Sequence, residues 1–356
     1  MKEFDYLKLN NLVITPKMNA QLNHLYELRG YVANYHPHMK ETFDRLVAVA
    51  KIQSTDASNR IEGIATTAPR LRAIMADKTR PANRSEAEIA GYRDVLALIH
   101  ENAEFIEINA ANILTLHKRL LGYTCAEWRG HFKDSDNQII TTYPDGTREV
   151  RFTPPQAVVT PQLITQLCAT YNEALTQTDF SPLILTAAFI FDFVSIHPFR
   201  DGNGRMSRLL MLLALYRTHF TVGKYISLEK LLAETKDEYY AALYQSSQQW
   251  HENQNDYAPF VSYFLGILIQ AYQQLIDRVG NSHQDKLPVT QLVLQVMHQQ
   301  LKPLTLREID NLIPQYSTVT IRRAVHQLLT AGKLRMVGRG RATRYMVGSS
   351  DDNFSN

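Results

Sequence analysis

The 356-residue sequence has little cysteine, no long hydrophobic run and little net charge. Two cysteines, Cys125 and Cys168, are too few for a disulfide framework or a four-cysteine metal site. The most apolar stretch, 183–196, is too short to cross a bilayer and contains Asp192. The first residues lack the apolar segment of a secretory signal. We therefore expect a soluble cytoplasmic protein with reduced thiols.

The overall composition is that of a globular protein. Hydrophobic residues make up 45% of the chain and charged residues 21%, which is enough apolar mass for a sizeable core. The net charge of +3 over the whole chain is too small to indicate nucleic-acid binding by itself. The length predicts two or three domains.

Apolar residues recur at spacings of three and four along most of the chain, which predicts a mainly α-helical fold. Ser181 followed by Pro182 predicts the start of a helix that is apolar on all sides and therefore buried. The other clear segments are 19–31, 39–53, 86–100, 110–121 and 161–175.

One stretch breaks the helical pattern. Residues 137–143 and 148–152 are β-prone, and Asp145-Gly146 lies in the connection between them. Asp-Gly between two such runs is a strong hairpin signal. We predict a single β-hairpin that neighbouring helices support.

The polar segment 281–286 predicts a domain boundary. Beyond it, a capping box from Thr305 to Glu308 predicts a helix start. Three helices followed by two short strands indicate a winged helix-turn-helix domain over 287–347, with a disordered tail over 348–356. The segments are 289–300, a helix that Thr305 opens, 317–331, 333–337 and 344–347.

This C-terminal region carries basic residues and no acidic one between Thr320 and Val347. A basic helix followed by a basic wing is typical of a DNA-binding module. A module that docks another protein through a solvated basic face remains the alternative. The basic residues are Arg322, Arg323, Lys333, Arg335, Arg339, Arg341 and Arg344.

The segment 197–208 concentrates groups suited to phosphate chemistry. A glycine-rich turn at a helix N-terminus presents backbone N–H groups to an anion. Two arginines three apart on the following helix can bind further phosphate oxygens. The residues predicted to bind phosphate are Gly202, Asn203, Gly204, Arg205 and Arg208.

Two further residues of this segment supply acid–base and metal chemistry. Asp201 suits Mg²⁺, which proteins hold with one or two carboxylates together with substrate phosphates. His197 titrates near neutral pH and is a natural general base for a hydroxyl nucleophile. Phe199 is the expected core anchor of the loop.

The segment resembles the signature of the Fic domain family, His-x-Phe-x-(Asp/Glu)-Gly-Asn-Gly-Arg-x-x-Arg, at every specified position. The resemblance implies a protein adenylyltransferase. His197 would deprotonate a Ser, Thr or Tyr hydroxyl of a target protein, and the hydroxyl would attack the α-phosphate of ATP. Asp201 would hold Mg²⁺ between the α- and β-phosphates, and Arg208 would bind the γ-phosphate.

Two other features resemble parts of this family. The hairpin resembles the family's flap, in which Val150, Arg151 and Phe152 would bind the target segment by strand-like pairing. Tyr239 resembles a tyrosine near the adenine end of the nucleotide. An inert hairpin and a core tyrosine remain the alternatives.

The string 58–63 fits the family's inhibitory pattern, (Ser/Thr)-x-x-x-Glu-(Gly/Asn). Ser58 and Glu62 share one face of a helix, and Gly63 suits a helix end. The resemblance implies that Glu62 pairs with Arg208 and so misorients ATP. In some relatives the same glutamate supports removal of AMP, and both roles stay open.

We therefore expect an N-terminal region over 1–105 with an inhibitory helix, a Fic core over 106–280 and the winged helix. Its partners would be ATP, a target protein that could be the chain itself, and DNA or protein at the winged helix. One alternative is a DNA-binding regulator whose Fic core senses nucleotide. Another is a Fic enzyme that transfers UMP or phosphate, and a homodimer stays open.

Overall fold

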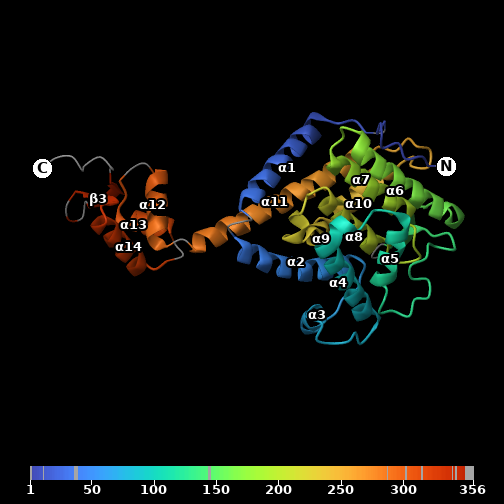
Figure 1. Cartoon of the computed structure of the whole chain (residues 1–356), viewed down its shortest axis with the longest axis horizontal. Coiled ribbons are helices and arrows are strands. Elements are labelled where there is room, and N and C mark those ends of the chain that lie inside the picture. The colour runs from blue at the N-terminus through green and yellow to red at the C-terminus, as the bar shows by residue number, and fades with distance from the viewer. Residues whose placement is uncertain are drawn as a thin grey trace. The chain divides into compact units, whose positions relative to one another are not determined.

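The computed structural model describes residues 2–10, 12–35, 39–142, 146–286, 288–300, 303–313, 316–338, 340 and 343–348. The chain divides into two compact units, Met1–Ile276 and Asp277–Asn356, and each is treated by itself. The first unit is mainly helical (Figure 1). Its helices are α1 (Pro16–Tyr35), α2 (Lys40–Ile61), α3 (Ala68–Met75), α4 (Arg84–Asn102), α5 (Ala110–Leu120), α6 (Thr160–Gln177), α7 (Pro182–Ile196), α8 (Asn203–Arg217), α9 (Leu228–Glu234), α10 (Lys236–Ser247) and the first part of α11 (Ala258–Lys286).

Helix α7 is the central element of this unit, as its apolar sequence predicts. The Ser181 hydroxyl accepts a hydrogen bond from the backbone N–H of Leu183, and Pro182 occupies the first turn, so the predicted helix start is confirmed. Nearly every side chain of the helix is buried. It packs against α6 and α8, and therefore brings its C-terminal end to the start of α8.

One carboxylate, Asp192, lies fully buried inside α7. Oδ2 accepts hydrogen bonds from the hydroxyls of Tyr6, at 2.6 Å, and Tyr257, at 2.8 Å. Oδ1 accepts one from Trp250 Nε1 at 2.6 Å. Burial nevertheless raises the pKa of this carboxyl, because desolvation outweighs the charge of Lys2 and the hydrogen bonds. These contacts fasten the N-terminal segment and residues 250–257 to the central helix.

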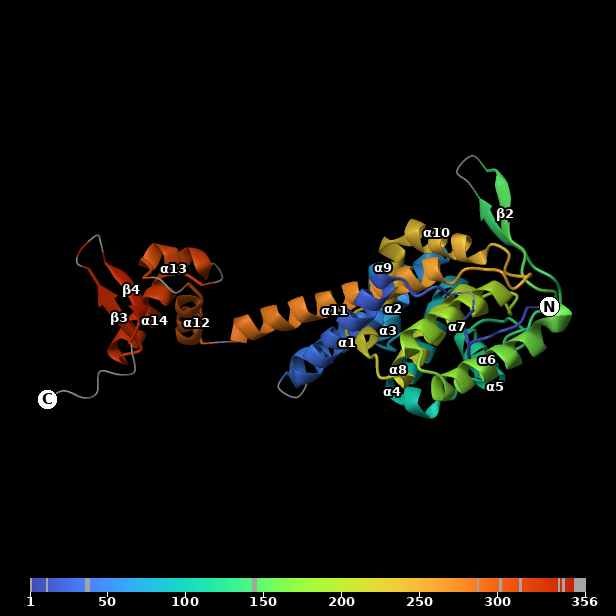
Figure 2. The same ribbon diagram turned by 90° about the horizontal axis from the view of Figure 1, so that it is seen from above.

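The predicted hairpin is present as β1 (Ile139–Thr142) and β2 (Arg148–Phe152). The strands pair antiparallel, with Ile140 opposite Val150 and an irregularity between Ile139 and Ile140. The residues of its turn from 143 to 145 lie outside the described ranges. Figure 2 shows the hairpin projecting from the helical body.

The polar segment 281–286 does not interrupt the helix that precedes it. Helix α11 continues through these residues to Lys286, and the division between the two units falls earlier, after Ile276. The segment contains neither proline nor glycine. Polar residues of other types do not stop a helix, since all of their backbone hydrogen bonds can be formed.

The second unit contains α12 (Val289–Gln300), α13 (Leu306–Leu312), α14 (Thr318–Thr330), β3 (Leu334–Val337) and β4 (Arg344–Val347). The two strands pair antiparallel, and the capping box between Thr305 and Glu308 is confirmed. One face of each helix packs into a shared apolar core that includes Val293, Ile309 and Ile321. The predicted tail lies outside the described residues beyond position 348.

No helix in the described part of the chain is long and apolar enough to span a membrane.

Candidate active site

The loop between α7 and α8 turns sharply at two left-handed residues. His197, which ends α7, has φ +49°, and Gly202, which precedes α8, has φ +83°. The N-cap residue of α8 is Gly202, which has no side chain to accept from the first backbone N–H groups of the helix. The predicted anion-binding turn is therefore placed at a helix N-terminus.

The side chain of Asn203 closes this loop on itself. Its Oδ1 accepts a hydrogen bond from the Phe199 backbone N–H at 2.8 Å, and its Nδ2 donates to the Phe199 carbonyl at 2.7 Å. Asn203 and Phe199 are both buried. The amide thus braces the loop, whereas the sequence grouped Asn203 with the phosphate-binding residues. Phe199 is a core anchor, as expected.

Residues of α5 and of the segment that follows it brace the loop from outside. The His117 ring stacks on Phe199 at 3.7 Å between centroids, and its Nε2 donates to the Asp201 carbonyl at 3.1 Å. Its Nδ1 accepts from the Gly130 backbone N–H, which assigns the proton to Nε2. The Lys133 ammonium donates to the Ile196 carbonyl at 3.3 Å. These contacts hold the loop in one shape.

The imidazole of His197 is neutral at physiological pH. Burial and, next, the nearby charge of Lys133 lower the pKa of His197 to about 4, although a hydrogen bond with the Val194 backbone opposes them. A neutral imidazole has a free lone pair and can accept a proton from a hydroxyl. Burial also lowers the pKa of Lys133, to about 8.

Arg208 is buried and faces α2. Its Nε donates to the Ser58 hydroxyl at 2.7 Å, and its Nη2 donates to the Ser58 carbonyl at 2.9 Å. The same Nη2 lies 2.8 Å from Glu62 Oε1. Helix α2 ends at Ile61, and Gly63 follows with φ +76°, as a helix end requires. Ser58 and Glu62 of the predicted inhibitory string therefore lie at this arginine, and Gly63 ends the string.

The Glu62 carboxylate also lies against the first turn of α8. A Cβ built on Gly204 would collide with Glu62 Oε1, so the carboxylate occupies the space beside that glycine. A negative group at this position is favoured by both the helix dipole and the Arg208 charge. It lies where the sequence predicts a phosphate.

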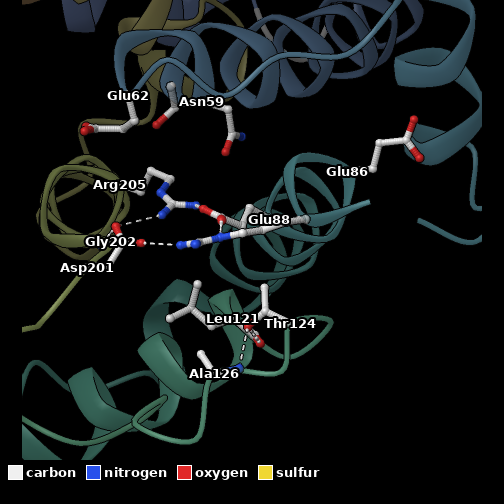
Figure 3. Close-up of polar contacts among 12 residues, drawn as sticks. Asn59, Glu62, Glu86, Glu88, Leu121, Thr124, Ala126, Asp201, Gly202 and Arg205 are labelled. Atoms are coloured by element: carbon white, nitrogen blue, oxygen red, sulfur yellow. Dashed lines mark hydrogen bonds and ion pairs between the residues drawn. The ribbon is translucent and has the colours of Figure 1, made fainter. Parts of the chain in front are cut away.

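Arg205 has different partners from those that the sequence predicts. Its side chain is buried, with Nη1 2.5 Å from Glu88 Oε2 and Nη2 3.4 Å from Asp201 Oδ1. Figure 3 shows Arg205 directed toward Glu88 of α4 and toward Asp201, with Glu62 at the end of α2. Arg205 and Arg208 thus point to different partners although they are three residues apart. The structure gives Arg205 an internal ion pair in place of an open phosphate site.

Asp201 is the candidate metal ligand. The carboxylate is 40% exposed and lies at the loop end beside the α8 N-terminus. Within the described ranges, no cluster of three or more His, Cys, Asp and Glu side chains could hold a metal. A single exposed carboxylate nevertheless suits Mg²⁺ where substrate phosphates supply further oxygens. The donor present therefore fits a metal that arrives with a nucleotide.

Tyr239 lies on α10 beside Arg208 and is 7% exposed. Its ring packs against Tyr240, Phe260 and Tyr263. A small enclosed void is lined by both Tyr239 and Arg208, but it has room only for a water molecule. The nucleotide role of Tyr239 stays a prediction.

Two of the three flap residues attach the hairpin to the body. Arg151 donates to the Tyr240 carbonyl and lies over the Tyr240 ring, 4.7 Å from its centroid. The Phe152 ring stacks on His251 at 5.5 Å. Val150 is exposed, at 49%. Strand β2, with which a target segment is predicted to pair, is therefore attached to the helical body through Arg151 and Phe152.

Sequence reasoning missed the braces of the loop and the partners of its charges. His117, Lys133, Arg84 and Glu88 belong to no recognisable motif. They lie 63 to 117 residues away from the residues in and next to the loop that they contact. The one available signal was charge at positions that helical periodicity assigns to the core, since Glu88 stands between Ala87 and Ile89.

Residues 107–215 match the model of the Fic/DOC family. Protein adenylyltransferase fic-1 of Caenorhabditis elegans is 30% identical over 160 residues, which cover 45% of this chain and 27% of that protein. Protein adenylyltransferase Fic of Nematostella vectensis is 27% identical over 186 residues, covering 49% and 40%. The chain thus spans well under half the length of these relatives.

Solved structures share the fold. A Fic family protein from Desulfovibrio desulfuricans G20 superposes with a TM-score of 0.59 at 21% identity, covering 94% of this chain and 97% of that one. A Fic domain containing signaling protein from Bacteroides thetaiotaomicron has a TM-score of 0.60 at 22% identity, covering 72% and 98%. At these identities the likeness concerns the fold.

Proposed function

We propose that this chain is a protein adenylyltransferase that moves AMP from ATP onto a Ser, Thr or Tyr hydroxyl of a target protein. The observation that carries the proposal is that one short loop has a neutral His197 at its start and the N-terminus of α8, with glycine as the N-cap residue, at its end. The Fic/DOC match and the names of the relatives support the same reaction.

The residues divide the work of the reaction as follows. His197 accepts the proton of the target hydroxyl, whose oxygen forms a bond to the α-phosphorus of ATP. The bond from that phosphorus to the oxygen bridging to the β-phosphate breaks, and pyrophosphate leaves. The N-terminus of α8 and Arg208 stabilise phosphate charge, so that catalysis is mostly positioning and charge neutralisation.

Mg²⁺ bound at Asp201 would neutralise charge on the phosphates. Asp201 would hold it through one carboxylate, which the His117 contact to the Asp201 carbonyl keeps in place. This role rests on the chemistry of the donor and on its position beside α8.

We further propose that Glu62 restrains the reaction. Glu62 and a γ-phosphate would compete for the same Arg208 guanidinium and for the same space beside Gly204. ATP could then bind only in an orientation in which its α-phosphate is not aligned for attack by a hydroxyl that His197 deprotonates. A role for Glu62 in AMP removal would use the same carboxylate to position a water.

ATP labelled at the α-phosphate and, separately, at the γ-phosphate tests the reaction. AMP transfer leaves only the α-label on protein, and His197→Ala abolishes it. His298→Ala, an exposed histidine of the second unit, is the matched control and retains the label. A γ-label on protein indicates phosphate transfer, and labelling by UTP but not ATP indicates UMP transfer. If neither label appears on protein even with Glu62→Gly, the result favours a domain that senses nucleotide without transferring it.

For the second unit we propose a winged helix-turn-helix that binds duplex DNA. Helix α14 buries Ile321 and Leu328, while Arg322 and Arg323 are exposed on its other face. Lys333 and Arg335 lie exposed at the first strand of the pair. Arg339 and Arg341, predicted for the wing, lie outside the described residues.

Fluorescence anisotropy of the full chain with a mixed-sequence duplex tests DNA binding. We expect affinity to fall steeply with salt, because phosphate contacts release counterions. Arg322→Ala with Arg323→Ala weakens binding, whereas Arg72→Ala, an exposed arginine of α3, does not. Absence of binding at low salt contradicts the proposal and favours a protein partner.

A further inference from the structure

Asp201 has a cationic partner outside the residues that match the Fic/DOC family. Arg84 Nη2, on the first residue of α4, lies 3.0 Å from Asp201 Oδ2. The other oxygen, Oδ1, accepts a hydrogen bond from the Gly202 backbone N–H at 2.6 Å and lies 3.4 Å from Arg205. One oxygen is therefore held by its own loop and helix, and the other by Arg84.

Arg84 belongs to a ring of four alternating charges. Its Nε donates to Glu88 Oε1 at 2.7 Å. The second Glu88 oxygen lies 2.5 Å from Arg205, and Figure 3 shows these two side chains directed toward each other. Two guanidinium groups and two carboxylates make the ring neutral. The charge of Asp201, which would attract a metal ion, is already compensated within the protein.

The members of the ring differ in their exposure to water. Arg205 is 1% exposed and Glu88 4%, whereas Asp201 is 40% and Arg84 73% exposed. An exposed guanidinium that leaves its partner is hydrated at once, so an exposed pair separates easily. Separation of Arg205 from Glu88 would leave buried charges without partners. Arg84 is therefore the member that can leave.

We propose that Arg84 is a displaceable counter-ion, which holds the metal-binding oxygen of Asp201 until a divalent cation takes its place. This inference rests on the proposed role of Asp201 as the metal carboxylate. A guanidinium and a divalent cation compete for Oδ2 and repel each other. The nucleotide-free protein therefore binds metal weakly, and the phosphates of ATP supply the charge that favours exchange. Glu88 retains Arg205 throughout, so the loop keeps its shape when Arg84 leaves.

Binding of Mn²⁺ to the full chain without nucleotide, measured from the EPR signal of the free ion, tests this inference. We expect Arg84→Gln to bind Mn²⁺ about three- to fivefold more tightly than the wild type, the factor corresponding to release of one exposed ion pair. The matched control is Arg80→Gln. It removes the same charge from an exposed residue four positions earlier, which makes no described contact with Asp201.

Equal Mn²⁺ affinities of the wild type and Arg84→Gln, or an equal gain in Arg80→Gln, overturn the inference. The double variant Arg84→Gln with Asp201→Asn separates this result from a failure of the proposed function. Loss of the gain in the double variant supports competition at Asp201. If the gain persists, the metal binds elsewhere, and the metal role of Asp201 is wrong as well. Urea unfolding of each variant verifies that the buried pair is intact.

Discussion

The Glu62 carboxylate lies beside Gly204, in the space that a Cβ would fill, while it also pairs with Arg208 at 2.8 Å. The two contacts place a negative group at the start of α8, where the helix end and an arginine converge. The same convergence is what a phosphate requires. In the proposed function, restraint by Glu62 and binding of the nucleotide would therefore compete for one electrostatic site.

Replacement of Glu62 tests this competition. Glu62→Gly removes a hydrogen bond between charged groups, worth about 1.5–3 kcal/mol. We expect the rate of α-label incorporation from ATP to rise about tenfold to a hundredfold, since each 1.36 kcal/mol is a factor of about ten. Asp56→Ala, which removes an acidic residue of the same helix that pairs with Arg60, serves as the control. An unchanged rate in a preparation whose label still depends on His197 contradicts the restraint.

The Arg205–Glu88 pair provides a second test. Loss of one partner of a buried pair is expected to lower the free energy of unfolding by about 3–5 kcal/mol. We expect Arg205→Met to do so, and Arg205→Met with Glu88→Leu to recover much of the loss, as measured by urea unfolding. Nucleotide affinity should fall in Arg205→Met and recover in the double variant, in parallel with the free energy of unfolding. If Arg205→Met weakens nucleotide binding while stability is kept, Arg205 contacts phosphate, as the sequence alone suggests.

The brace formed by Asn203 gives a third prediction. Asn203→Ala removes two buried hydrogen bonds to Phe199, with an expected loss of about 1–3 kcal/mol in the free energy of unfolding. Asn112→Ala, near the start of α5, removes a hydrogen bond to the Glu107 carbonyl and is expected to have a smaller effect. Full stability of Asn203→Ala combined with weaker nucleotide binding would instead mean that the amide contacts the nucleotide.

Buried histidines predict how stability depends on pH. Burial is the main cause that lowers the pKa of His100 to about 3 and those of His117 and His197 to about 4, against about 6.5 in the unfolded chain. Between these values the unfolded state binds more protons, so the free energy of unfolding falls as the pH is lowered. From pH 7 to pH 5 the loss is about 2 kcal/mol for each histidine. Urea midpoints across this range measure it.

His100 provides the control for this pH dependence, because it lies in contact with Tyr216 and outside the loop. We expect His100→Gln to make the urea midpoint less dependent on pH, while the pH profile of label incorporation is unchanged. A wild-type midpoint that is constant from pH 7 to pH 5 would mean that these histidines are hydrated and titrate normally.

Much of the fold follows from local patterns. Helix α7 begins at Ser181 and Pro182, because a capping hydroxyl and a proline in the first turn favour a start there. The capping box at Thr305 and the hairpin around Gly146 are also confirmed. The polar segment 281–286 was predicted as a domain boundary; the division between the two units falls nearby, after Ile276, and α11 continues through the segment because polar composition by itself does not end a helix.

The sequence by itself determined the chemistry that the loop can perform, because a base, a carboxylate, a glycine turn and two arginines stand within twelve residues. It also predicted that Ser58 and Glu62 share a helical face. Only the tertiary structure decided which charge each arginine meets: Arg208 meets Glu62, 146 residues away, and Arg205 meets Glu88. Helical periodicity predicts which side of a helix is buried. The residue that a buried side chain contacts depends on how distant helices pack. The sequence predicted Asp201 as a metal ligand from its place in the loop. The ion pair of Asp201 with Arg84 follows from the packing of α4 beside the loop.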